Sequence, residues 1–155
     1  MTDKSQDWKK GRGKLGVLAP LDGFWQAQAE SAMGSVVCSR KFEKVLSGKY
    51  IQLTANWQFG EKSYVEIAMI GVNDQGAVAF WSFTSDGKNS TGLLADVTDI
   101  HPQAIGFEAL MDAGLARMAY WPDEYSGFFW VVENKSKKGW NRFVEHHYFR
   151  VITGY

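Results

Sequence analysis

Residues 48–87 read GKYIQLTANWQFGEKSYVEIAMIGVNDQGAVAFWSFTSDG. Glycine-containing turns divide this stretch into apolar and aromatic runs that are too short and too rich in β-branched residues for helices. Asn73-Asp74-Gln75-Gly76 and Ser85-Asp86-Gly87-Lys88 have hairpin chemistry, because Asn, Asp and Gly accept the left-handed dihedral angles of tight turns. The stretch therefore predicts consecutive antiparallel strands.

The same spacing continues in both directions along the chain. Turn markers recur every 11 to 16 residues from Gly34 to Gly139. The strands that they delimit are expected at 23–32, 35–46, 49–59, 62–72, 77–85, 88–97, 104–111, 115–121, 127–134 and 140–152. A long antiparallel meander has unpaired strands at its two edges, and closing into a barrel pairs these strands with each other. We therefore expect an all-β fold, a single antiparallel up-and-down β-barrel of about ten strands.

The length of 155 residues suits one domain with its own core. Residues 21–155 are expected to form the barrel domain. Residues 1–20 are basic and rich in glycine and polar residues, so we expect a flexible N-terminal arm there. The aromatic share of 15% agrees with strands whose faces are half buried.

The charge balance narrows the classes of partner. The 17 basic and 17 acidic residues cancel, so the chain has no general attraction to nucleic acid or to anionic membranes. Cys38 is the only cysteine, which fits a reducing compartment, and the sequence shows no leader segment and no apolar run of transmembrane length. One cysteine and three histidines give no convergent metal-ligand set. We expect a cytoplasmic protein that binds a small molecule, without a metal.

Side chains alternate across a strand, so parity separates the interior from the solvent face. Strand 35–46 places Arg40 and Phe42 on its apolar face, and strand 49–59 does the same with Trp57. The apolar residues that we expect to line the interior include Val36, Phe42, Leu53, Trp57 and Ile67.

The last strand is ambiguous. The odd positions of 140–152 are the more apolar, so we expect Glu145 and His147 to face inward. A buried charge is costly unless it is paired, and Arg40 is therefore expected to pair with Glu145. That pair either only stabilises the core or, together with Tyr120, orients a bound polar group.

Two features at the ends of the barrel resemble a known superfamily. Asp22-Gly23-Phe24-Trp25 opens the first strand, and Arg150 lies near the end of the last one. A Gly-x-Trp start with a late Arg resembles the signature of the calycins, the superfamily of lipocalins and fatty-acid-binding proteins. The resemblance implies that Gly23, Trp25 and Arg150 are structural: the Trp plugs the closed end and the Arg packs over it, where a guanidinium gains cation–π energy.

Within that superfamily the chain is most similar to a bacterial lipocalin-like domain family of unknown function. The similarity lies in Leu21-Asp22-Gly23-Phe24-Trp25, Arg40-Lys41-Phe42 and Leu46-Ser47-Gly48. More distantly, the chain resembles nitrobindin-type haem barrels, which implies His147 or His146 as an iron ligand. Gln26-Ala27-Gln28-Ala29 departs from the alternating glycines of those barrels, so we expect no cofactor and keep haem as an alternative.

Our leading interpretation is that the barrel binds a small, partly apolar ligand that can be anionic, and we assign no catalytic residue. The expected binding residues are Arg40, Phe42, Trp57, Tyr120, Glu145 and His147. One alternative is an acid/base enzyme of decarboxylase or isomerase type that uses Glu145 or His147. Another is a structural or homodimerisation module with a filled interior, because aromatic residues occupy both faces of several strands. If the last strand has the opposite parity, His146, Tyr148 and Arg150 become the anion-binding residues.

Overall fold

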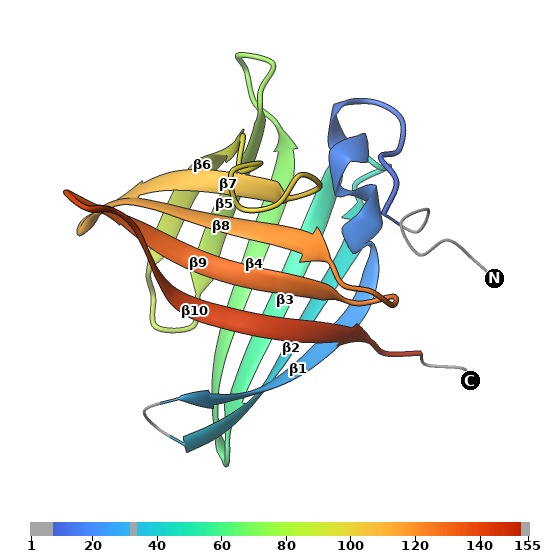
Figure 1. The fold of residues 1–155 in the computed structure, drawn as a ribbon. Coiled ribbons are helices and arrows are strands. Elements are labelled where there is room, and N and C mark those ends of the chain that lie inside the picture. Colours follow the sequence, from blue (N-terminus) through green and yellow to red (C-terminus); the bar gives the residue numbers. More distant parts are fainter. Residues whose placement is uncertain (1–7, 32–33, 153–155) are drawn as a thin grey trace.

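The computed structural model describes residues 8–31 and 34–152, which form one closed barrel (Figure 1). The elements are a 3-10 helix η2 (Lys14–Leu21) and the strands β1 (Gly23–Ser31), β2 (Gly34–Val45), β3 (Tyr50–Phe59), β4 (Lys62–Val72), β5 (Val78–Thr84), β6 (Asn89–Ala95), β7 (Ile105–Met111), β8 (Gly114–Pro122), β9 (Phe128–Ser136) and β10 (Gly139–Arg150). Each strand is antiparallel to its sequence neighbours, and β10 pairs with β1. The expected all-β, up-and-down barrel is confirmed.

The turn chemistry located the strands to within a few residues. For example, β6 was expected over 88–97 and spans Asn89–Ala95. It ends early because Asp96 accepts hydrogen bonds from the backbone and hydroxyl of Thr98, which start a loop. Position 32 of the first expected strand lies outside the described residues.

The alternating strand directions give the barrel two different ends. The hairpins β1–β2, β3–β4, β5–β6, β7–β8 and β9–β10 lie at one end, and η2 covers the other (Figure 1). Leu18 and Leu21 of η2 are fully buried in the same cluster as Trp25. Residues 14–20 of the expected flexible arm thus belong to the closed end of the barrel, while residues 1–7 lie outside the described part.

Aromatic rings fill the half of the interior next to η2. Phe128 is fully buried at the centre of this group. Its ring centroid lies 4.7 Å from that of Trp25, 5.2 Å from Tyr148 and 5.5 Å from Tyr120. Rings at such separations add packing energy to their burial, so this aromatic group stabilises the closed end of the barrel.

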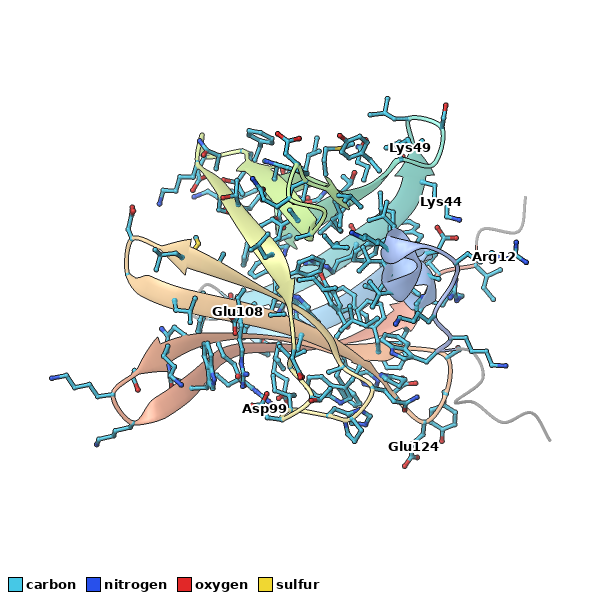
Figure 2. The ribbon with its side chains drawn as sticks, turned by 90° about the horizontal axis from the view of Figure 1, so that it is seen from above. Arg12, Lys44, Lys49, Asp99, Glu108 and Glu124 are labelled. Atoms are coloured by element: carbon cyan, nitrogen blue, oxygen red, sulfur yellow. The ribbon has the colours of Figure 1, made fainter. Side chains whose placement is uncertain are left out.

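The connection between β6 and β7 folds back over the outer face of the wall. Val97 is buried there together with Val131 of β9. Arg117 of β8 donates two hydrogen bonds to Asp99, at 3.0 and 2.8 Å, and Asp99 lies on the outer side of this wall (Figure 2). Hydrogen bonding to Arg117 holds the pKa of Asp99 below its usual range. The connection is therefore held against the outer face of the wall by apolar packing and by the ion pair of Arg117 with Asp99.

A second carboxylate extends this clamp across the outer wall. Glu133 of β9 accepts from Arg117 and from Arg142, each at 2.9 Å. Arg142 also donates to Glu145 at 2.7 Å. We call Asp99, Arg117, Glu133, Arg142 and Glu145 the outer ion-pair network. Its buried members are Arg117 and Glu133, whose side chains are 5% and 6% exposed.

Candidate functional site

A cavity of about 290 Å³ occupies the half of the interior that faces the hairpins. It is too large to be a packing defect, since a single water needs only about 15 Å³ of such space. Its walls are mostly aromatic or apolar: Trp57, Tyr64, Phe80, Phe107, Met111, Met118, Trp130 and Val132. The polar and charged residues of the lining are Arg40, Glu66, Ser82, Thr84, Ser90 and Arg117, of which Arg117 pairs with Asp99 and Glu133. Apolar walls with a few polar groups are typical of small-molecule sites.

Two hollows of about 640 Å³ lie elsewhere on the protein. One follows β5, β6 and β7 and includes Leu93 and Leu110, and the other lies beside the β8–β9 connection and includes Tyr125. Neither contains a buried charged group without an ion-pair partner among the described residues. The volume of a hollow therefore does not identify the candidate ligand site. The buried charged group in the lining of the interior cavity does.

Arg40 is the distinctive group of the interior cavity. It is 1% exposed, and its Nη2 donates to Tyr120 Oη at 2.8 Å. Its guanidinium carbon lies 4.4 Å from the centroid of the Trp130 ring. Among the described residues no carboxylate lies within ion-pair distance of Arg40, and its buried Nε–H has no hydrogen-bond partner. A buried cation with spare donors facing a cavity is suited to an anionic ligand group.

The protonation of Arg40 and Tyr120 follows from their surroundings. Burial alone would lower the pKa of the Arg40 guanidinium, but Tyr120, Tyr148 and Glu66 raise it, and the net direction is upward. Burial raises the pKa of Tyr120 although Arg40 and the Trp130 indole act against it. Arg40 is therefore a permanent cation and Tyr120 a neutral phenol. The nearest acceptor for the phenol proton is the weak one at Met118 Sδ, 3.8 Å away, so Tyr120 can also donate to a ligand.

Four of the six expected binding residues face the interior. Arg40 and Trp57 line the cavity, and Phe42 packs edge-on against Tyr120 with ring centroids 5.8 Å apart. The parity of β2 and β3 is therefore as expected. The other two, Glu145 and His147, lie on the outer face.

The expected inward position of Glu145 is wrong, and a β-bulge is the reason. The pairing of β10 with β9 shifts between Arg142 and Val144, and Phe143 is the extra residue. Arg142 is on the outer side opposite Glu133, whereas Val144 is opposite the cavity residue Val132. A bulge moves the following residues to the other face. Glu145 thus pairs with Arg142 outside, and the expected Arg40–Glu145 pair does not form.

The expected inward position of His147 is wrong for the same reason. Its Nε2 lies 2.8 Å from Asp123 Oδ2, its ring stacks on Phe129 with centroids 4.2 Å apart, and the Phe149 ring lies tilted beside it at 4.3 Å. The opposite parity places His146 and Tyr148 inside, but Arg150 does not join them. An anion clamp of all three residues is therefore not formed.

β4 also differs from expectation, and the difference adds a site residue. Ile67 was expected to line the interior, but its side chain is 44% exposed and lies opposite Phe83 on the outer face. Tyr64 and Glu66 line the cavity in its place. Glu66 Oε2 accepts a hydrogen bond from the buried Ser82 hydroxyl. The more apolar set of β4 side chains faces outward, so hydropathy pointed to the wrong face.

The signature residues at the closed end take the positions that the resemblance implied. The Arg150 guanidinium carbon lies 4.2 Å from the centroid of the Trp25 ring, and Trp25 Nε1 donates to the Leu21 carbonyl at 2.8 Å. Gly23 has a φ of 122°, and a Cβ there would lie 2.6 Å from Arg150 Nη1. A larger residue at position 23 would displace the guanidinium from the indole.

Comparison with known proteins adds no family. No protein-family model and no curated protein sequence matches this chain. The closed ten-stranded antiparallel barrel is compatible with a calycin-like fold. Within 8–31 and 34–152, no helix is long and apolar enough to cross a bilayer.

The interior does not fit a haem held by a last-strand histidine. His147 is outside, and His146 is wedged between Trp57 and Trp130, with 5.3 Å between its ring centroid and each of theirs. Neither histidine lines the cavity. In the described part of the chain, no three His, Cys, Asp or Glu side chains gather as metal ligands.

His146 predicts a pH dependence of stability. Burial, aided by Arg40, lowers its pKa from 6.5, so the folded protein holds the imidazole neutral. Below about pH 6.5 the unfolded chain binds a proton that the folded one does not, and stability falls as the pH decreases from there toward the folded pKa. Thermal unfolding between pH 7.5 and 5 should show this loss. His146→Gln should make that part of the profile flatter. An unaltered profile in His146→Gln would contradict the assignment.

Proposed function

We propose that the protein binds a small, partly apolar molecule with an anionic group inside a calycin-like barrel. The single observation that supports this is the fully buried Arg40 guanidinium, which borders the cavity and lacks a carboxylate partner among the described residues. An uncompensated buried cation is costly, and a bound anion would compensate it. The aromatic walls would bury the apolar part of the ligand.

The alternatives have less support. The acid/base enzyme relied on Glu145 or His147, and both side chains are on the outer face. A module with a filled interior would have no cavity of about 290 Å³. Binding is therefore the function that the interior supports best.

The experiment compares an anionic probe with a neutral one of the same shape. We expect 4-ethylbenzoate to bind wild-type protein at pH 7 with one site per chain in calorimetric titration, and 4-ethylbenzamide to bind at least about tenfold more weakly, because hydrogen bonds to charged groups are the stronger ones. Arg40→Met should remove the preference for the acid.

Lys41→Met is the matched control. Lys41 adjoins Arg40 in sequence, but its exposed side chain pairs with Glu43 on the outer face. This variant should keep the preference for the carboxylate. Equal binding of acid and amide by wild type, no binding of either, or an unchanged preference in Arg40→Met would overturn the proposal.

A further inference from the structure

Two charged residues of the cavity lining, Arg40 and Glu66, have opposite charges but form no ion pair with each other, whereas the third, Arg117, is already paired with Asp99 and Glu133. Arg40 of β2 is paired in register with Ala55 of β3, and Ala55 is paired with Glu66 of β4. The three residues form one row across neighbouring strands, so the Cα atoms of Arg40 and Glu66 are about 10 Å apart.

Each charged group turns to a different partner. The Arg40 guanidinium extends across the barrel to Tyr120 and Trp130. Glu66 accepts from Ser82 through Oε2, and the structure gives its Oε1 no protein partner among the described residues. The two groups still influence each other, since Glu66 raises the pKa of Arg40. The cavity therefore has a donor end at Arg40 and an acceptor end at Glu66.

From this arrangement we infer that the ligand is amphoteric: a small amine-bearing carboxylate with a flat apolar body. Its carboxylate would accept from Arg40, and its ammonium group would donate to Glu66 Oε1. Trp57, Phe80 and Phe107, which also line the cavity, would pack against the body. The inference rests on the proposed function and adds a specificity residue, Glu66, for the second end of the ligand.

The test uses pairs of probes that differ only in one terminal group. 3- and 4-(aminomethyl)benzoate place an ammonium where 3- and 4-ethylbenzoate have a methyl group, and the two isomers sample two spacings. We expect wild-type protein to bind at least one aminomethyl probe about tenfold or more tightly than its ethyl partner in calorimetric titration, because a charge-assisted hydrogen bond is gained. Glu66→Gln should abolish that preference.

Glu43→Gln is the matched control, because Glu43 is an exposed carboxylate on the outer face of β2. It should retain the wild-type preference. The inference fails if the ethyl probes bind in an Arg40-dependent manner without an advantage for the aminomethyl probes, or if the advantage persists in Glu66→Gln. It also fails if Glu66→Gln lowers the melting temperature by several degrees without changing the preference, which would make Glu66 a structural partner of Arg40. If no probe binds at all, the proposed function itself fails.

Discussion

Replacing Arg40 by methionine is expected to make the empty barrel more stable, by about 1–4 kcal/mol. Removing a guanidinium from water costs several kcal/mol. Arg40 recovers part of that cost through one hydrogen bond to Tyr120, worth about 1.5–3 kcal/mol, and a contact with Trp130, worth about 2 kcal/mol. No carboxylate among the described residues lies within ion-pair distance of Arg40 to make up the rest. Methionine fills similar space without a charge.

Thermal and urea unfolding of the ligand-free protein measure this effect. A gain of this size corresponds to a rise in melting temperature of about 2–4 °C per kcal/mol in a protein of this length. Lys41→Met should remain within about 0.5 kcal/mol of wild type, because its side chain is exposed. Arg40→Met/Tyr120→Phe removes the phenol left without its donor and should be at least as stable as the single variant. A clear loss of stability in both Arg40 variants would assign Arg40 to the core rather than to a ligand.

Glu133→Gln is expected to lose about 3 kcal/mol of stability, or about 6–12 °C in melting temperature. The Glu133 side chain is 6% exposed and bridges Arg117 and Arg142. Glutamine has the same shape but cannot neutralise the buried Arg117. The bidentate contact of Arg117 with the exposed Asp99 remains, so the loss stays within the range for a single broken buried pair.

The same network contains the control. Glu145 contacts Arg142 at 2.7 Å, but its side chain is 58% exposed. Glu145→Gln should therefore change the free energy of unfolding by less than about 0.5 kcal/mol, because water already solvates this pair. Comparable losses for the two variants would show that burial does not decide the strength of this network.

The strand pattern could be predicted because it depends on local chemistry. Left-handed turn residues are read directly from the sequence, and β2 and β3 alternate clearly enough to place Arg40, Phe42 and Trp57 inside. The cation at the base of the candidate site was therefore available from sequence alone.

The partners of that cation could not be predicted. Phe143 is the extra residue of a bulge that no feature of the sequence predicts. Because of this bulge, Glu145 and His147 face outward rather than inward. On β4, an acid faces the cavity while Ile67 faces outward, so hydropathy points the wrong way. The fold of the β6–β7 connection over the outer wall depends on contacts distant in sequence, such as that of Arg117 with Asp99.

The seam between β1 and β10 has a consequence for how the chain acquires its fold. It pairs Trp25 with Arg150 and Gln26 with Phe149, and Arg150 also donates to the Asp22 carbonyl, 128 positions away. Every other pair of neighbouring strands in the barrel is also adjacent along the chain. A growing polypeptide can form those strand pairs one after another, but β1 and β9 keep unpaired edges until β10 has been synthesised. The β1–β10 pair is thus the last strand pair of the barrel that can form, and the edges of β1 and β9 stay unpaired until it does.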